Sequence, residues 1–120
     1  MIGDTNETQT TGPLEANKFD GGKPSYSLLP VDALAELVRV YDIGAKKYGR
    51  KNWEKGMEYH RLYDALQRHA NAFWSGEDYD PVDQQHHLAS VAWTALTMIA
   101  YQKRGIGTDD RDDRLVVNKR

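Results

Sequence analysis

The segment DPVDQQHHLASVAWTALTMIAYQKRG, residues 80–105, joins an acidic, histidine-containing start to a long apolar run. Asp80 and Pro81 are typical of an N-cap and a first helical residue. Gly105 follows two basic residues and is typical of a helix end. The pattern predicts a helix from about Asp80 to Arg104. Because this helix is apolar around most of its circumference, we expect it to be central in the fold.

Two further helices are predicted before it. The first runs from about Pro30 to Lys47 and carries apolar residues at helical spacing. The second runs from about His60 to Ser75, and Gly76 follows it as a C-cap. No long alternation typical of strands and no internal repeat is present. The expected fold class is therefore all-α, a small helical bundle.

The chain has 120 residues, a hydrophobic fraction of 39%, a net charge of −2 and no cysteine. We expect a mobile tail over residues 1–17, which are nearly devoid of apolar side chains, and one helical domain over residues 18–120. No apolar run approaches the roughly 20 residues that span a bilayer. We expect an intracellular, cytoplasmic protein without membrane association. The balanced charge also argues against stable nucleic-acid binding.

Acidic and imidazole side chains are concentrated between Glu77 and His87. One interpretation is a metal or acid–base site, because oxygen ligands suit Mg²⁺ or Mn²⁺ and Mn²⁺ also accepts imidazole. The other interpretation is an ordinary helix N-terminus, in which Asp80 is the cap and Asp83 lies in the first turn. Gly76 favours the first interpretation for Glu77, since a turn there would bring its carboxylate toward His87.

A polar stripe follows along the same predicted helix, at Asp83, His87, Ser90, Thr94 and Thr97. Unpartnered buried polar groups cost about 1–3 kcal/mol each, so these side chains need hydrogen-bond partners. The hydroxyls could bond to carbonyls of the preceding turn, with His87 a buried and satisfied histidine. Alternatively, the stripe lines a pocket.

A basic and aromatic segment lies between the first two predicted helices and contains Lys46, Lys47, Tyr48, Asn52 and Trp53. Cations suit phosphate groups, an aromatic ring can stack on a nucleobase, and an amide can recognise an adenine-like edge. The alternative is an ordinary solvated surface. The combination nevertheless favours a nucleotide site.

Three other positions could contribute. Lys23 ends a Gly-Gly-Lys turn that could contact a phosphate, although the segment lacks the spacing of a Walker A loop. His69 lies on the apolar face of the second predicted helix, where a packed core histidine is the simpler interpretation. Arg68 lies on its polar face, where a solvated charge is the alternative. Nucleophilic cysteine chemistry is excluded by composition.

Four blocks in this order resemble the phage dATP/dGTP diphosphohydrolases, relatives of the MazG-like all-α nucleotide pyrophosphatases. They are KFDGGKPSYSLLP (18–30), GAKKYGRKNWEKG (44–56), RLYDALQRHANAFWSGEDYD (61–80) and HLASVAWTAL (87–96). The resemblance implies metal-dependent hydrolysis of dGTP or dATP to the monophosphate and pyrophosphate, with Mg²⁺ or Mn²⁺. It also implies a role in phage nucleotide metabolism, in the host cytoplasm, with dGMP supplied for 2-aminoadenine synthesis. Such enzymes are homodimers or homotetramers, and exposed Trp74 and Trp93 would suit such contacts.

The chain departs from the wider MazG-like pattern, in which an E-x-x-E helix precedes an E-x-x-D helix. Here the E-x-x-D of the central region is Glu77 to Asp80, at a predicted helix start, and relatives carry His and Asn in place of Ser90 and Thr94. We expect attack of water at the α-phosphorus, and an adaptor that binds nucleotide or nucleic acid without catalysis is the alternative. The expected metal ligands are Glu36, Glu77, Asp80 and His87, with Asp64 and Asp83; the expected catalytic residues are Glu36, Glu77, Lys47 and Arg68; the expected substrate-binding residues are Lys23, Lys46, Tyr48, Asn52, Trp53, His69, Ser90 and Thr94.

Overall fold

The computed structural model describes residues 16–112, and the chain divides into two units, residues 1–30 and 31–120. Each unit is described by itself. Residues 1–15, which make up most of the predicted tail, lie outside the described residues. The described part of the first unit contains a turn in which the amide of Lys23 donates to the carbonyl of Asp20, and a short 3₁₀ helix, η1 (Tyr26–Leu28).

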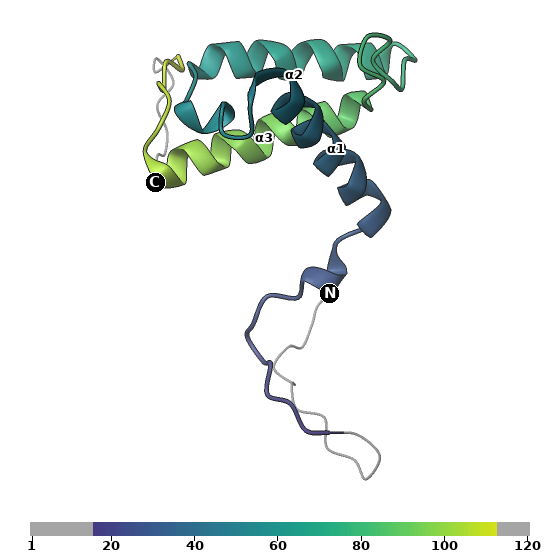
Figure 1. Ribbon diagram of the computed structural model, residues 1–120, viewed down its shortest axis with the longest axis vertical. Coiled ribbons are helices and arrows are strands. Elements are labelled where there is room, and N and C mark those ends of the chain that lie inside the picture. The colour runs from purple at the N-terminus through teal and green to yellow at the C-terminus, as the bar shows by residue number, and fades with distance from the viewer. Residues whose placement is uncertain (1–15, 113–120) are drawn as a thin grey trace. The chain divides into compact units, whose positions relative to one another are not determined.

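The second unit contains three α-helices: α1 (Val31–Tyr48), α2 (Tyr59–Trp74) and α3 (His87–Arg104). A short 3₁₀ helix, η2 (Trp53–Lys55), lies between α1 and α2. The ribbon shows α2 and α3 side by side and antiparallel, and α1 also contacts α3 (Figure 1). The all-α class is therefore confirmed. Among the described residues, no helix combines the length and apolarity that a membrane crossing requires.

The apolar core of the second unit lies between α2 and the C-terminal half of α3. Tyr59, Leu62 and Tyr101 are buried there, and Trp53 packs against them from η2. The hydroxyl of Tyr101 donates to the carbonyl oxygen of Trp53 at 2.6 Å, which satisfies the buried phenol. This contact holds η2 against α3.

A segment after α3, residues 106–111, binds the start of α2, and we call it the C-terminal strap. The amide of Tyr59 donates to the carbonyl of Thr108 at 2.9 Å, and the amide of Thr108 donates to Met57 at 3.1 Å. The backbones can approach because Gly56 and Gly107 face each other: a Cβ on Gly56 would lie 2.7 Å from the nitrogen of Gly107. The strap therefore anchors the loop that precedes α2.

The buried face of α3 is largely polar. Ser90, Thr94 and Thr97 are buried along this face, toward the rest of the unit. The side chains of Leu88, Leu96 and Ile99 are exposed at 42%, 48% and 50%. The helix therefore buries these hydroxyls together with Ala89 and Tyr101, and it leaves a second, apolar face exposed.

The prediction that the third helix begins at Asp80 is wrong, because α3 begins at His87. The carboxylate of Asp80 accepts from the amide of Val82 at 2.8 Å, which makes a local turn instead of a helix cap. Gln84 then adopts a φ of 61°, and the amide of Asp80 donates to the carbonyl of Gln85 at 2.8 Å. Since these backbone groups are paired inside a compact loop, a longer helix gains no hydrogen bonds.

Candidate functional site

The end of α2 aims Glu77 toward α3. Gly76 has a φ of 107°, its amide donates to the carbonyl of Phe73 at 3.0 Å, and the amide of Glu77 donates to Ala72 at 3.1 Å. This pair of bonds is the Schellman motif, in which a glycine without a Cβ reverses the chain at no steric cost. The predicted Gly76 C-cap is confirmed, and it places a carboxylate beside the first turn of α3.

The chain then returns to α3 through a loop, residues 78–86. The amide of His87 donates to the carbonyl of Asp78 at 2.9 Å, and Tyr79 and His86 form an antiparallel bridge. The ring of His86 accepts from the amide of Leu88 at 3.0 Å, so His86 is the N-cap of α3. This loop fixes both ends of the acidic segment and holds Asp80 in a half-buried position.

A chain of three side chains joins the end of α2 to the start of α3. Nε2 of His87 lies 2.7 Å from Oε1 of Glu77, and Nδ1 of His87 lies 2.8 Å from Nδ1 of His69 on α2. His87 is buried, with 4% of its surface exposed. One ligand atom each from His69, Asp80 and His87 lies within 4.8 Å of the others. We call the four residues His69, Glu77, Asp80 and His87 the acid–imidazole cluster.

Burial lowers the pKa of His69 below its ordinary value of 6.5, and the nearby His87 lowers it further. The imidazole of His69 is therefore neutral at pH 7 and retains one nitrogen lone pair. Neutral imidazole and carboxylate oxygen are a donor set that suits Mn²⁺ better than Mg²⁺. The residues of the cluster thus fit a divalent cation of this class.

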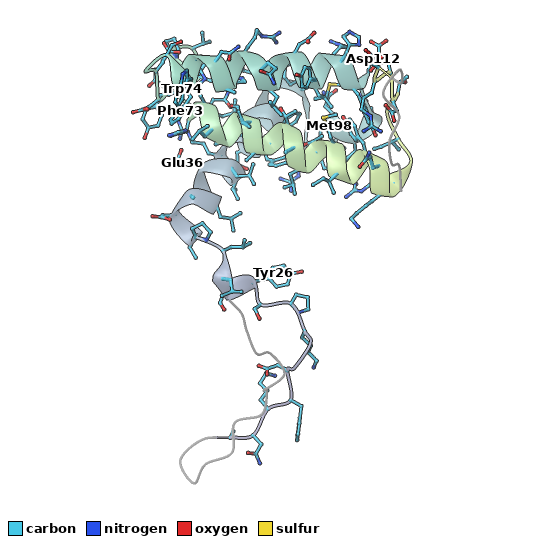
Figure 2. The ribbon with its side chains drawn as sticks, turned by 180° about the vertical axis from the view of Figure 1, so that it is seen from behind. Tyr26, Glu36, Phe73, Trp74, Met98 and Asp112 are labelled. Atoms are coloured by element: carbon cyan, nitrogen blue, oxygen red, sulfur yellow. The ribbon has the colours of Figure 1, made fainter. Side chains whose placement is uncertain are left out.

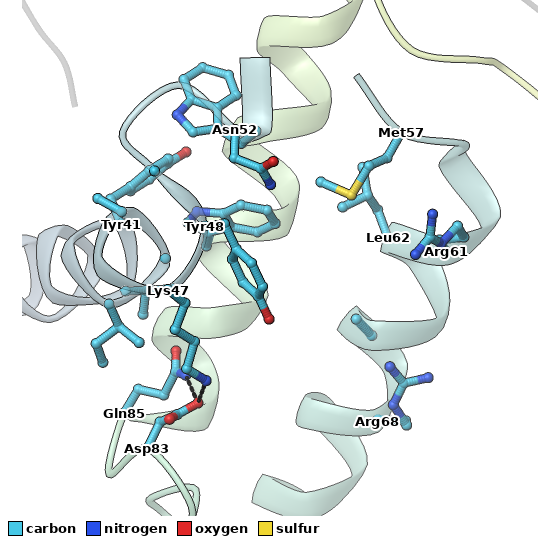
Figure 3. A pocket seen from close by; sticks show the side chains of 18 of the residues that line it. Tyr41, Lys47, Tyr48, Asn52, Met57, Arg61, Leu62, Arg68, Asp83 and Gln85 are labelled. Atoms are coloured by element: carbon cyan, nitrogen blue, oxygen red, sulfur yellow. Dashed lines mark hydrogen bonds and ion pairs between the residues drawn. The ribbon is translucent and has the colours of Figure 1, made fainter. Parts of the chain in front are cut away.

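A pocket of about 680 Å³ lies between α1, α2 and the loop that joins them. Tyr48 and Asn52 line it on the α1 and loop side, and Arg61 and Arg68 line the wall formed by α2 (Figure 3). Trp53 of η2 also lines it. A pocket of roughly 300–1,000 Å³ can hold a drug-sized ligand. Its lining combines aromatic rings, an amide and guanidinium groups, which together suit an aromatic, anionic ligand.

One end of the pocket is formed by a salt bridge between helix and loop. Nζ of Lys47 lies 2.8 Å from Oδ2 of Asp83, and Nε2 of Gln85 donates to the same oxygen at 3.1 Å (Figure 3). The hydrogen bond from Lys47 lowers the pKa of Asp83, and that with Asp83 raises the pKa of Lys47. Asp80 also raises the pKa of Lys47 through its charge, so the acid–imidazole cluster is close to this end of the pocket.

The structure therefore brings most of the predicted residues into two adjacent groups. Residues of the pocket and of the cluster are consecutive on α2, where Arg68 lines the pocket and His69 belongs to the cluster. The predicted residues in the pocket are Lys47, Tyr48, Asn52, Trp53, Asp64, Arg68 and Asp83, and those in the cluster are His69, Glu77, Asp80 and His87.

Besides the two predicted residues of the polar stripe, three predicted residues lie outside both groups. Glu36 is half-buried on α1 (Figure 2) and belongs neither to the pocket lining nor to a ligand group among the described residues. Lys46 lines a second hollow of about 590 Å³ with Arg39 and Arg50. Lys23 lies in the first unit, which is described by itself.

The hydroxyls of the polar stripe have partners inside the protein. Ser90 donates to Oε1 of Gln85 at 3.0 Å, Thr94 donates to the carbonyl of Ser90 at 3.2 Å, and the hydroxyls of Thr97 and Tyr41 lie 2.9 Å apart. None of the stripe's Ser and Thr residues lines the pocket. Thr94 thus bonds to the carbonyl one turn before it, as the first interpretation expected, whereas Ser90 and Thr97 bond to side chains of other segments.

Sequence reasoning missed several residues of the pocket. Trp93, expected to be exposed, is half-buried, lines the pocket and has its ring centroid 5.7 Å from that of Tyr41. Arg61 also lines the pocket. The signal for Arg61 was present in the sequence, because Arg61, Asp64 and Arg68 share one face of α2 at a helical spacing of three and four. The side of Trp93 could not be inferred, since α3 is apolar over most of its circumference.

Comparison with known proteins gives a family. The family model described as "dATP/dGTP diphosphohydrolase, N-terminal" matches residues 14–111. A protein of Salmonella phage PMBT28, named dATP/dGTP diphosphohydrolase, is 41% identical over 94 residues, which is 78% of this chain and 32% of that protein. The chain thus spans about a third of the length of this curated relative. No solved structure matches.

The fold and the site define a helical protein with a pocket lined by aromatic and cationic side chains and with a carboxylate–imidazole cluster near one end of it. The family match, over residues 14–111, includes all three α-helices. The chain belongs to the family of dATP/dGTP diphosphohydrolase N-terminal domains.

Proposed function

We propose that the chain hydrolyses purine deoxynucleoside triphosphates, dGTP or dATP, to the monophosphate and pyrophosphate. The observation that carries the proposal is an aromatic and cationic pocket whose Lys47 end lies close enough to the acid–imidazole cluster to feel the charge of Asp80. The name of the phage relative supports the choice of substrate. In phages that use 2-aminoadenine, the dGMP formed would be a precursor of that base.

The pocket residues bind and orient the substrate in this proposal. The ring of Tyr48 or Trp53 stacks on the purine, and the amide of Asn52 hydrogen-bonds to its edge. The guanidinium of Arg68 contacts the phosphates beside the cluster, where charge develops on the leaving pyrophosphate. Lys47 reaches the same region when it releases Asp83.

We propose Mg²⁺ or Mn²⁺ as the cofactor. Asp80 and the imidazoles of the cluster would hold it, with Glu77 beside them, and Asp64 and Asp83 face the pocket as further carboxylates. A divalent cation bound there would neutralise charge on the phosphate oxygens. Glu36 would have to reach the site through a movement of α1 or from another copy of the chain.

We propose that the active form is a homodimer or homotetramer. The exposed apolar face of α3, with Leu88, Leu96 and Ile99, supports this. Contiguous exposed apolar surface of this kind marks interaction sites in soluble proteins. Trp74 is also exposed, at the end of α2 (Figure 2).

The test is incubation of the purified chain with dGTP and with dATP in the presence of Mn²⁺, followed by assay of pyrophosphate and of the monophosphate. We expect stoichiometric formation of both products and loss of the reaction with EDTA. No product at micromolar protein, together with salt-dependent DNA binding, would instead support the adaptor without catalysis.

A pair of matched variants connects the reaction to the pocket. Arg68→Gln removes a cation from the pocket lining, and we expect kcat/KM to fall by at least tenfold. Arg39→Gln removes a cation from α1, outside this pocket, and should leave kcat/KM within about twofold. Equal effects of the two substitutions would contradict the assignment of the pocket.

A further inference from the structure

Four aromatic side chains line the pocket, and they differ in how far each ring is already packed against the protein. They are Tyr41, Tyr48, Trp53 and Trp93. A nucleobase stacks on an aromatic side chain through the face of the ring, so a face must be open to the pocket. The ring that the protein leaves uncovered is therefore the one that can bind a base.

Trp53 is part of the internal packing of the protein. Its ring is stacked with that of Tyr101, with centroids 6.3 Å apart, and the edge contact with Tyr41 has centroids 5.9 Å apart. The guanidinium carbon of Arg104 lies over the same ring, 5.2 Å from its centroid. Since three side chains contact this ring, we assign Trp53 to the support of η2 against α3.

Tyr41 and Trp93 continue this packed group of rings. Their centroids lie 5.7 Å apart, and both side chains are half-buried. The hydroxyl of Tyr41 lies 2.9 Å from that of Thr97, which ties the ring to α3. Tyr41 thus joins Trp53 to Trp93, and the three rings form one continuous wall of the pocket.

Tyr48 stands apart from this wall. Its surface is 67% exposed, and its ring makes no contact with another aromatic ring and no cation–π contact within residues 16–112. Figure 3 shows the ring in the space between α1 and α2. Among the rings of the pocket, that of Tyr48 is therefore the open one.

The end of α1 places Tyr48 and Asn52 on one hydrogen-bonded turn. Tyr48 is the last residue of α1, and Gly49 ends the helix with a φ of 98° and an amide that donates to the carbonyl of Ala45 at 2.9 Å. The amide of Asn52 then donates to the carbonyl of Gly49 at 3.2 Å. An open ring and a side-chain amide thus lie on the same side of the pocket (Figure 3).

From these contacts we propose that Tyr48 is the residue that stacks on the nucleobase of the substrate, and that Trp53 supports the pocket wall without binding the base. The inference rests on the nucleotide substrate of the proposed function, where either ring could stack. Every base has a π face, so stacking is tolerant of base identity. Tyr48 therefore contributes affinity for dGTP and dATP alike and does not select between them.

The test compares two ligands, of which only one has a base. The first is a dGTP analogue with an uncleavable imido bridge between the α- and β-phosphates, and the second is inorganic triphosphate. Isothermal titration calorimetry with Mg²⁺ measures both affinities. Tyr48→Ala should weaken binding of the analogue by about 5–150-fold, the range for loss of one base–aromatic stack. Binding of triphosphate should be nearly unchanged, and an equal loss for both ligands would overturn the proposal.

Matched variants separate the ring of Tyr48 from its hydroxyl and from the pocket wall. Tyr48→Phe keeps the ring and should bind the analogue as the unaltered chain does. Tyr63→Ala is the control, because Tyr63 is an exposed tyrosine of α2 outside the pocket lining, and its affinity should be unchanged. Trp53→Phe should lower the melting temperature with little change in affinity. A loss of affinity in Trp53→Phe at an unchanged melting temperature would instead make Trp53 the stacking ring.

The dATP analogue with the same imido bridge tests the claim about base identity. Tyr48→Ala should weaken its binding by the same factor as that of the dGTP analogue. A loss confined to one of the two analogues would contradict a stacking role, because a stack without hydrogen bonds cannot distinguish them so sharply.

NMR of a chain with labelled tyrosine rings gives a readout that needs no substitution. Addition of the dGTP analogue should move the ring-proton signals of Tyr48 to lower frequency, since a stacked base shields them, and movement confined to other tyrosines would overturn the proposal. None of these readouts requires turnover. Binding through Tyr48 without hydrolysis of dGTP would contradict the proposed function alone. Hydrolysis of dGTP with full analogue affinity in Tyr48→Ala would contradict this inference alone, and a lack of binding by the unaltered chain would contradict both.

Discussion

Glu77 illustrates how one backbone conformation determines the role of a side chain. Its carboxylate is half-exposed, yet the Schellman motif at Gly76 directs it to Nε2 of His87. A carboxylate without this contact would be solvated loop charge. The contact makes Glu77 the outer end of the chain that leads through His87 to His69.

We predict that Glu77→Gln lowers Mn²⁺-dependent turnover of dGTP at limiting Mn²⁺ by at least tenfold. The amide is neutral and holds the proton of His87 more weakly than the carboxylate does, because hydrogen bonds to charged groups are stronger. The melting temperature should be nearly unchanged, since half of the Glu77 side chain is exposed. Steady-state kinetics and differential scanning calorimetry test both parts; full activity in the variant would make Glu77 only loop charge.

The pair of His60 and Asp110 joins the C-terminal strap to α2. The hydrogen bond with Asp110 raises the pKa of His60 above its ordinary 6.5, and the hydrogen bond with His60 lowers the pKa of Asp110 below its ordinary 3.8. The raised pKa of His60 stabilises the fold at low pH, and this contribution is lost as the pH rises through its folded-state pKa. The lowered pKa of Asp110 stabilises at higher pH, and this contribution is lost as the pH falls through its folded-state pKa.

The pair should therefore contribute most between the ordinary values of these two groups, 3.8 and 6.5. We predict that the melting temperature of Asp110→Asn falls furthest below that of the unaltered chain in this window. The difference should shrink as the pH rises above the folded-state pKa of His60. Thermal melts from pH 4 to pH 9 measure it, and a difference that is independent of pH would contradict the prediction.

At the scale of elements, the pocket depends on how tightly the strap and the loop before α2 approach each other. Gly56 has a φ of 91°, and Gly107 has a φ of 80° with a hypothetical Cβ 2.8 Å from the carbonyl oxygen of Met57. Both positions are therefore closed to other residues by conformation and by space. The segment from η2 to the start of α2 carries Trp53 and Met57 into the pocket wall.

We predict that Gly56→Ala destabilises the chain by about 1–3 kcal/mol, the cost of a strained backbone at a non-glycine residue. Gly44→Ala is the matched control, because Gly44 lies within α1 and no atom lies within 4 Å of a Cβ built there. That change should stabilise the chain by about 0.5–1 kcal/mol, as expected for alanine in a helix. Urea unfolding of the two variants tests the contrast, and equal effects would refute the close approach.

At the scale of the whole molecule, the arrangement of α3 is unusual because this helix leaves an apolar face exposed. Its buried side carries three Ser and Thr hydroxyls and a histidine as well as Ala89 and Tyr101, and its exposed side carries Leu88, Leu96 and Ile99. Burial of apolar surface contributes about 25 cal/mol per Å², so this face gains stability only when something covers it. A second copy of the chain is the partner expected from the proposed oligomer.

We predict that the unaltered chain is a dimer or larger in light scattering coupled to size-exclusion chromatography, and that Leu96→Lys shifts it toward the monomer with its helical content retained. A lysine on the covered face would bury an unpaired charge. Tyr63→Lys is the control, since Tyr63 is exposed on α2 rather than α3. A monomeric unaltered chain, or the same shift in both variants, would contradict the assignment of the α3 face.

The sequence alone determined the all-α class, the positions of α1 and α2 to within a residue or two, and the glycine ends at Gly76 and Gly105. These features are local: helical periodicity and left-handed caps depend on neighbouring residues. The basic and aromatic segment that lines the pocket was also predicted, because its residues are close together in the sequence.

The tertiary structure decided the rest. The acidic segment forms a loop rather than the first turns of α3, because Asp80 and Gln84 pair their backbone groups there. The tertiary structure turned the polar stripe of α3 inward, where each hydroxyl has a partner. It also brought His69 to His87 across two helices. Such contacts join residues that are distant in the sequence, and they depend on which helix faces pack together, which periodicity by itself does not specify.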